Sequence, residues 1–205
     1  MPRPDRSRAA LLDTAALLFR RQGYAATGVN QILEAASVKA GSLYHHFPGG
    51  KQELAADVVG SVGGDIERRL RGFLDSDVGV ADIVDAWIDL MSAGLASDRR
   101  DGCPIEPIAT ESVNASPQVR DASARVFASW CLAVADRLRA DGWPDAEADQ
   151  TALAVVALLE GALILSRIAG EAAPLNAAKA AARTLISAVP VVRASTQPRN
   201  PDTRD

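Results

Sequence analysis

The chain has 205 residues, of which 48% are hydrophobic and 23% are charged, with a formal net charge of −4. This balance supports a buried core and excludes a chain that is disordered throughout. Aromatic residues make up only 4%, alanine is abundant and β-branched runs are short, so the composition favours helices. The length suits one large domain or a small domain followed by a larger one.

The charge is unevenly distributed along the chain. Residues 1–55 hold seven Lys and Arg against four Asp and Glu, which gives this quarter +3 and leaves −7 for the remainder. A basic module on an acidic body is typical of a protein whose first part binds an anion such as nucleic acid.

The composition of particular stretches predicts a soluble cytoplasmic protein. The opening MPRPDRSRAALL lacks the apolar core of a signal peptide. The most apolar stretch, Ala152 to Leu165, contains Glu160 and is interpreted as too short to cross a bilayer. Cys103 and Cys131 are far apart and in no metal-ligand spacing, so we expect reduced, buried thiols without a metal or cofactor.

The first quarter of the chain predicts three helices after an arm at residues 1–5 that carries Arg3. The first helix runs from about Arg6 to Gly23, because apolar residues recur at helical spacing: Leu11, Leu12, Ala15, Leu18 and Phe19. Thr27 is the predicted N-cap of a second helix over residues 28–36. A turn at residues 37–39 leads to a third helix over residues 40–47, which Pro48 stops. Two short helices joined by such a turn make a helix-turn-helix.

A long helix is predicted from Lys51 to about residue 74. Gly60, Gly63 and Gly64 fall in its middle, where each costs about 1 kcal/mol relative to alanine. Two interpretations stay open: close packing or a kink at these glycines, or a compliant connector between the first module and the body.

The remainder of the chain predicts more helices and shows no strand or hairpin signal. The expected helices cover residues 80–96, 103–113, 117–142, 144–170 and 174–189, and a polar tail at residues 191–205 is expected to be disordered. The predicted fold is therefore all-α, with about nine helices. We expect one domain over residues 1–50 and a larger helical domain over residues 51–190.

One stretch, GVNQILEAASVKAGSLYHHFPGGKQEL, resembles the DNA-binding domain of the TetR/AcrR transcriptional regulators. The motif GCPI at residues 102–105 and the run LLEGALILSRIAG resemble the LmrA/YxaF-like branch of that family. The resemblance implies a ligand-responsive regulator, most often a repressor, which binds a palindromic operator in double-stranded DNA as a homodimer.

The resemblance also implies which residues contact DNA. The helix over residues 40–47 would lie in the major groove, with Leu43 and Phe47 facing inward. The candidate DNA-binding residues are Thr27, Lys39, Ser42, Tyr44, His45, His46 and Lys51. Their chemistry fits, because hydroxyl and imidazole groups bond base edges or phosphates and a lysine near a helix start adds charge to an anion site. Tyr44 covering the core, or the histidines as plain surface residues, are the alternatives.

Two positions depart from the family pattern. Ala40 stands just before Gly41, where lysine is common, and Lys39 lies one place earlier. Ser37 occupies a turn position where glycine is usual. The fold should tolerate both changes, but Lys39 need not reach the phosphate that the usual lysine reaches.

The body is expected to supply a dimer interface and a pocket. The last two helices carry Ala, Leu and Val on more than one face, which predicts a four-helix bundle between two copies. The candidate residues for a small hydrophobic ligand are Phe73, Trp87, Met91, Ile105, Ile108, Phe127 and Trp130. Glu160 is predicted to pair with Arg167, to contact a ligand, or to sit at a partly exposed helix position.

Other classes of function have less support. The sequence holds no HExxH motif, no P-loop and no GxSxG, and both histidines lie in the basic module. We therefore do not expect an enzyme. A helical small-molecule carrier or scaffold without DNA binding is the alternative.

Overall fold

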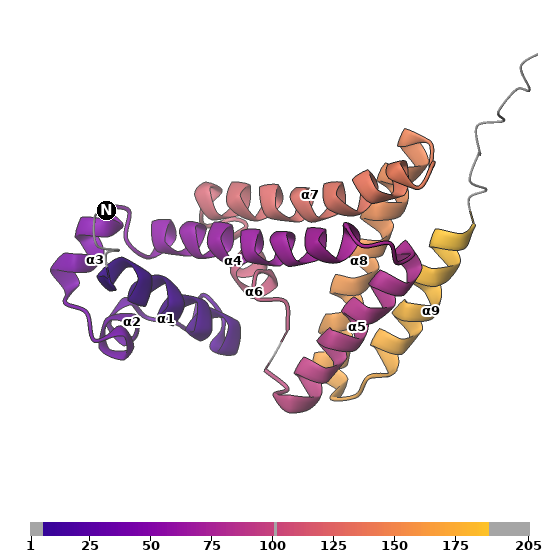
Figure 1. Ribbon diagram of the computed structural model, residues 1–205. Coiled ribbons are helices and arrows are strands. Elements are labelled where there is room, and N and C mark those ends of the chain that lie inside the picture. Colours follow the sequence, from indigo (N-terminus) through magenta and orange to yellow (C-terminus); the bar gives the residue numbers. More distant parts are fainter. Residues whose placement is uncertain (1–5, 101, 189–205) are drawn as a thin grey trace, which may run out of the picture.

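The computed structural model describes residues 6–100 and 102–188, and within these ranges it is all helical with nine α-helices and no strand (Figure 1). The predicted fold class and number of helices are confirmed. The predicted arm at residues 1–5 and most of the tail at residues 191–205 lie outside the described part. The helices are α1 (Arg6–Gln22), α2 (Val29–Ala36), α3 (Ala40–His46), α4 (Lys51–Leu74), α5 (Val80–Ser97), α6 (Glu106–Ser112), α7 (Pro117–Ala140), α8 (Asp145–Ala169) and α9 (Ala173–Ser187).

The helices form two groups joined by one long element. α1, α2 and α3 cluster at one end of the molecule, and α4 leaves this cluster and runs beside α7 into the body (Figure 1). At the opposite end α5 packs against α9, and α8 packs against α7 and α9. The short α6 lies beneath α4 and contacts α1, so it joins the body to the N-terminal cluster.

The N-terminal cluster has its own small core. Leu11 and Phe19 of α1, Ile32 of α2, and Leu43 and Phe47 at α3 have no solvent exposure. Full burial of one such side chain contributes about 1.5–3 kcal/mol relative to leaving it exposed. The inward direction predicted for Leu43 and Phe47 is confirmed, and it fixes which face of α3 remains outside.

The glycines of α4 serve close packing at one position. A Cβ at Gly63 would collide with the methyl groups of Val126 on α7, and the indole Nε1 of Trp130 donates a 3.0 Å hydrogen bond to the Gly63 carbonyl. Gly60 has no neighbour within 4 Å of the corresponding position. α4 runs without interruption from Lys51 to Leu74. The glycine at position 63 thus lets α7 approach α4.

The helix α8 has the length predicted for it and extends past the apolar run at residues 152–165 at both ends. The run alone was interpreted as too short to cross a bilayer. The whole helix of 25 residues is long and apolar enough, by length and composition alone, to cross a membrane. The criterion is weak evidence, since core helices of soluble proteins also meet it, and α8 packs against two other helices.

Candidate DNA-binding surface and ligand cavity

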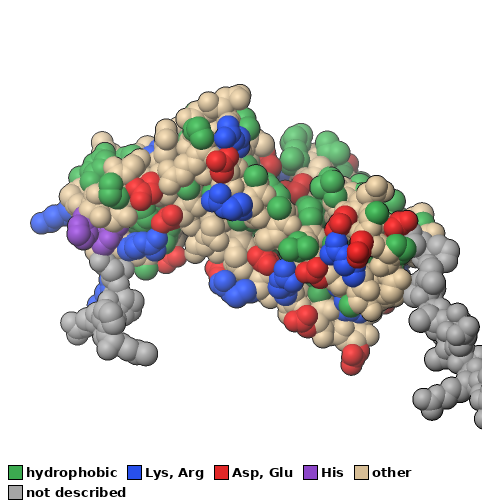
Figure 2. Space-filling model, turned by 90° about the horizontal axis from the view of Figure 1, so that it is seen from above, with side chains coloured by type: hydrophobic (Ala, Val, Ile, Leu, Met, Phe, Trp, Pro, Cys, Tyr) green, Lys and Arg blue, Asp and Glu red, His purple; other side chains and the backbone are tan. Residues whose placement is uncertain are grey.

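The outward face of α3 carries most of the predicted DNA-binding residues. Tyr44 is 55% exposed, His45 is exposed and Ser42 is half-buried, whereas Leu43 on the opposite side is fully buried. Figure 2 shows the histidines at this end of the molecule, close to Lys and Arg side chains. The alternative in which Tyr44 covers the core has no support from this exposure. An outward hydroxyl, phenol and imidazole on one short helix suit contacts to phosphates and base edges.

The two histidines differ in their surroundings. The ring of His46 is half-buried and packs edge-on against His45 and Phe47, at centroid distances of 4.9 and 6.4 Å. His45 forms the outer end of this stack, on the exposed face. Within the described residues no cluster of His, Cys, Asp and Glu could hold a metal ion. His45 is therefore the better placed of the two for an external contact.

The start of α3 is open to an approaching surface. Lys39 is the N-cap residue and its side chain is exposed, and it makes no capping hydrogen bond. Apart from its chain neighbours and the backbone of its own helix, no atom of the described residues lies within 4 Å of the position that a Cβ of Gly41 would take. The absence of a side chain at Gly41 is therefore not required by packing within the chain, and it leaves room for a partner.

Thr27 has a structural role that differs from its prediction. The N-cap of α2 is Gly28, and Thr27 is fully buried. Its Oγ1 donates a 2.7 Å hydrogen bond to the Gly23 carbonyl and accepts a 3.1 Å hydrogen bond from Gln22 Nε2. The predicted N-cap was wrong by one residue, because this hydroxyl closes the α1–α2 turn. Because the whole residue has no solvent exposure, this structure does not present Thr27 for the predicted phosphate contact.

Lys51 lies at the junction between the N-terminal cluster and the body. Its ammonium is 4.1 Å from the centroid of the Tyr24 ring, a cation–π contact. Burial lowers the pKa of Lys51, and the nearby Glu111 carboxylate opposes this. Glu111, on α6, also accepts a 2.5 Å hydrogen bond from the Ala25 N–H. The predicted phosphate contact of Lys51 would compete with its contact to Tyr24.

The turn before α3 holds a backbone conformation that favours glycine. Ser37 has φ 55° and ψ 40°, and it is the one non-glycine residue with positive φ in the described ranges. Its N–H bonds the Glu34 carbonyl at 3.0 Å and so ends α2. Serine at this position, where the family usually has glycine, thus carries backbone strain of about 1–2 kcal/mol.

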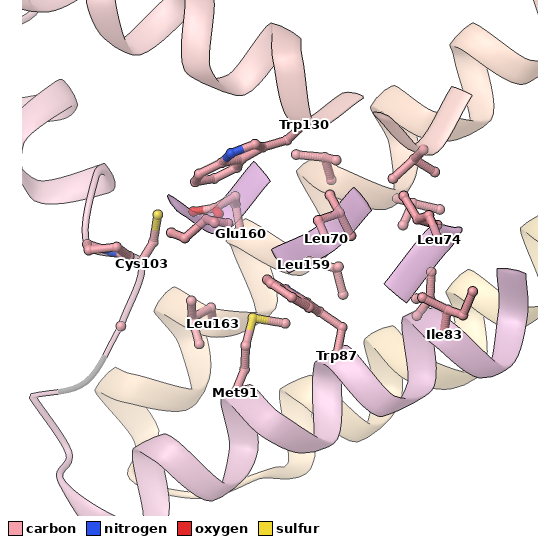
Figure 3. Close-up of a pocket in the computed structure, with 17 residues that line it drawn as sticks. Leu70, Leu74, Ile83, Trp87, Met91, Cys103, Trp130, Leu159, Glu160 and Leu163 are labelled. Carbon is pink, nitrogen blue, oxygen red and sulfur yellow. The ribbon is translucent and has the colours of Figure 1, made fainter. Parts of the chain in front are cut away.

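An apolar cavity of about 140 Å³ lies in the body between α4, α5, α7 and α8 (Figure 3). Three of the seven residues predicted for the ligand site line it: Trp87, Met91 and Trp130. The other lining residues were not among those seven: Ile66, Leu70, Leu74, Ile83, Val84, Gly102, Cys103, Pro104, Val134, Val155, Val156, Leu159, Glu160 and Leu163. The cavity therefore depends on α8, which was predicted to form the dimer interface and for which only Glu160 was also considered as a ligand contact.

The other four predicted ligand residues lie elsewhere. Phe73 is 47% exposed and meets Trp87 edge-on at 5.9 Å, on the outside of the cavity wall. Ile105 and Ile108 are fully buried around α6 and do not line the cavity. Phe127 packs against the Trp130 ring at 5.2 Å and supports it from behind. Size and hydrophobicity alone do not distinguish the residues that line a cavity from those that pack around it.

Glu160 brings a carboxyl group to this apolar cavity. The residue is half-buried, and its Oε2 is buried without a hydrogen-bond partner in the described structure. Burial raises the pKa of Glu160 to about 7; a hydrogen bond from the Cys103 thiol acts against this rise and the Glu106 charge adds to it. Burial also raises the pKa of Cys103 well above its usual value, which agrees with the predicted inert thiol. Of the alternatives for Glu160, ligand contact fits its place on the cavity wall.

The last two helices leave an apolar surface uncovered. Leu153, Leu165 and Ile168 of α8 are between 57% and 74% exposed. Ile164 of α8 and Leu185 of α9 are also exposed. Several exposed large apolar side chains on two neighbouring helices are typical of an interface.

Comparisons with known proteins agree with this arrangement. The family model for bacterial regulatory proteins of the tetR family matches residues 11–58, and the model for the C-terminal domain of LmrA/YxaF-like transcriptional regulators matches residues 80–181. The HTH-type transcriptional regulator LmrA of Bacillus subtilis is 31% identical over 170 residues, which cover 82% of this chain and 90% of LmrA. The HTH-type transcriptional repressor KstR2 of Rhodococcus jostii is 38% identical over 90 residues, which cover 44% of this chain and 35% of KstR2.

A solved structure supports the same fold. The reduced form of NemR from E. coli superposes with a TM-score of 0.78 at 22% identity, covering 90% of this chain and all of NemR. The matching families are transcriptional regulators and not enzymes. The chain is a TetR-family transcriptional regulator with an N-terminal helix-turn-helix DNA-binding domain and an LmrA/YxaF-like C-terminal domain.

Proposed function

We propose that this regulator is a cytoplasmic homodimeric repressor that leaves a palindromic operator when a small hydrophobic molecule enters the cavity. The observation that carries the proposal is the division of α3 into two faces. Leu43 anchors one face in the core, and Ser42, Tyr44 and His45 lie on the other. A short helix held in this way is suited to the major groove.

Two copies are needed for selective binding. One α3 helix reads few base pairs, and a two-fold dimer places a second copy about one turn of DNA away. The exposed apolar residues of α8 and α9 support pairing through these helices, because a partner would remove them from water. We infer repression because the relative KstR2 is named a transcriptional repressor.

The helix α4 connects the cavity to the DNA-binding end of the molecule. Ile66, Leu70 and Leu74 of α4 form part of its wall, and the same helix begins at Lys51 beside the N-terminal cluster. A ligand that displaces this wall would move α4 and change the separation of the two α3 helices in the dimer. Both could then no longer occupy their half-sites.

A second connection runs through α6. Cys103 and Pro104 line the cavity just before α6. Near the C-terminal end of α6, the Glu111 carboxylate accepts a hydrogen bond from the Ala25 N–H. Movement of the 103–104 segment would therefore reach the α1–α2 turn as well. If ligand-bound and DNA-bound crystal structures had the same separation of the two Tyr44 residues, this mechanism would be excluded.

Operator binding tests the DNA-reading role directly. We expect a footprint on DNA flanking the regulator's own gene or a neighbouring gene. In fluorescence anisotropy, Tyr44→Phe should weaken binding to that site. Lys51→Ala should weaken binding to all sequences and lower the salt slope by about one. Glu147→Gln, an exposed change on α8, is the matched control. Failure to bind any flanking DNA would favour the carrier.

A further inference from the structure

The cavity between α4, α5, α7 and α8 has one charged side chain on its wall. Among the described residues that line it, Glu160 carries a charge and no Lys or Arg is present. The indole N–H of Trp130 is already bonded to the Gly63 carbonyl. It is therefore not available to Glu160 or to a ligand. The Cys103 thiol donates to the Glu160 carboxyl group, but the wall offers no partner to its Oε2 atom.

The carboxyl group of Glu160 lacks a complete set of partners. Figure 3 shows Glu160 beneath Trp130 with Cys103 to one side. Its Oε2 is buried with no hydrogen-bond partner in the described structure. A buried polar atom left in this state is destabilising, and more so when the group is charged. Buried polar atoms in folded proteins nearly always have a hydrogen-bond partner. A ligand that donates a hydrogen bond to Oε2 would supply the missing one.

We propose that the cavity binds a hydrophobic amine in its protonated form, with Glu160 accepting hydrogen bonds from the ammonium group. This inference rests on the ligand-binding role proposed above and names the chemical class of the ligand. Trp87 and Met91 lie on the wall opposite Glu160 and would contact the apolar body (Figure 3). Aromatic faces also attract cations, which adds to the carboxylate interaction.

The size of the cavity limits the ligand. A cavity of about 140 Å³ is close to the ~150 Å³ apolar cavity that accepts benzene in another protein. A molecule of one ring with a short aminoalkyl arm therefore fits with little rearrangement.

A cation explains this site better than a neutral donor does. A phenol or alcohol would satisfy one oxygen but leave the carboxylate charge buried, which is costly in an apolar site. An ammonium group cancels that charge and makes a charge-assisted hydrogen bond. The second acid nearby, Glu106, adds to the negative potential around Glu160. Both acids thus favour a positive ligand.

Calorimetric titration with a matched pair of probes tests the proposal. The full-length protein is titrated with benzylamine, a cation, and with benzyl alcohol, its neutral isostere. We expect the amine to bind at least about tenfold more tightly than the alcohol. Because this comparison uses the unaltered protein, it does not depend on how any variant folds.

Two variants locate the interaction. Glu160→Gln keeps the shape of the side chain and removes its charge, so it should reduce the preference for the amine to less than about threefold while alcohol binding stays unchanged. Glu147→Gln removes an exposed charge from the same helix and should keep the full preference. Equal changes in both variants would show a long-range charge effect and would overturn the proposal.

The pH dependence provides an independent readout. The groups that face Glu160 are the Cys103 thiol, which stays neutral, and Glu106. Since the amine binds the ionised carboxylate, its affinity should rise between about pH 6 and about pH 8 in the parent and stay flat in Glu160→Gln. An affinity that falls over this range would mean that the protonated acid binds a neutral ligand.

Operator binding separates the two proposals. An alcohol that binds as tightly as the amine, or no binding of either probe, overturns the amine assignment even when the protein binds its operator. Amine binding that follows the pattern above, in a protein that binds no operator, instead leaves the assignment standing and overturns the proposed repressor.

Discussion

The DNA-reading end and the ligand cavity differ in how far apart in the sequence their parts lie. The outward face of α3 is formed within the segment from Ser37 to Lys51, around one buried residue, Leu43. The cavity wall takes residues from Ile66 to Leu163 on four helices. A face on one helix follows from its periodicity, but a cavity depends on how helices meet. The first is therefore easier to predict, and the second is the place where ligand chemistry can diverge.

The largest expected change in folding stability concerns Glu160 on the cavity wall. Its pKa in the folded protein is about 7, above its usual value of 4.5, so the folded state holds a proton that the unfolded chain releases. Stability should therefore fall as pH rises from about 4.5 to about 7, and the loss remains in full above that range. Glu160→Gln removes this loss and should be more stable than the parent by about 2–3 kcal/mol at pH 8.

Urea unfolding at matched protein concentrations, at about pH 8 and at about pH 4.5, measures this difference. The gain should shrink at the lower pH, where the parent carboxyl is protonated in both states. A gain of equal size at both values would mean that the carboxyl is not the cause.

The next largest effect contrasts two glycines of α4. Gly63→Ala would place a methyl group against Val126 and disturb the bond from Trp130, so we expect a loss of about 1–3 kcal/mol. Gly60→Ala has free space and should gain about 0.5–1 kcal/mol from helix propensity. Urea unfolding of the two variants at one protein concentration gives the comparison. Similar changes in both would indicate that the glycines make α4 compliant and do not serve packing.

Much of the fold could be predicted from the sequence, and the reasons are local. The resemblance placed Leu43 and Phe47 inward, and both are fully buried. The first three helices were bounded by Gly23 and Pro48, which act within a few residues of their own position. Thr27 was misplaced because a buried turn hydroxyl and an N-cap hydroxyl have the same local pattern. What separates them is the bond to the Gly23 carbonyl, which only the structure shows.

The ligand site could be predicted only in part, because helix rotation decides which residues line a cavity. Phe73 and Leu70 lie on the same stretch of α4, and the smaller Leu70 faces the cavity while Phe73 faces outward. Glu160 was recognised as unusual within an apolar run, but its direction was open. The rotation of α8 against α7 and α9 settles it, and this is a property of tertiary packing.

A smaller effect tests whether the open side of α3 faces DNA. Gly41→Ala adds a methyl group where the chain has no neighbour, so folding stability should stay level or rise by up to about 1 kcal/mol. Operator affinity should fall by about tenfold, since a methyl group would separate the helix from the groove. Anisotropy and urea unfolding on the same samples give both numbers, with Gly60→Ala as the control. Unchanged operator affinity would show that this face of α3 does not approach DNA closely.

The smallest expected effect concerns Ser37, where the DNA-reading end departs from the family pattern. With φ 55° its backbone is strained, and glycine has no such strain. Glycine also makes the unfolded chain more flexible, so the net gain for Ser37→Gly is only about 0.5–1 kcal/mol. Ser37→Ala loses the hydroxyl without relieving the strain, and it should bring no gain. If alanine stabilised the protein as much as glycine in urea unfolding, the hydroxyl and not φ would be responsible. The strain would then have no part in how α2 ends before the DNA-reading helix.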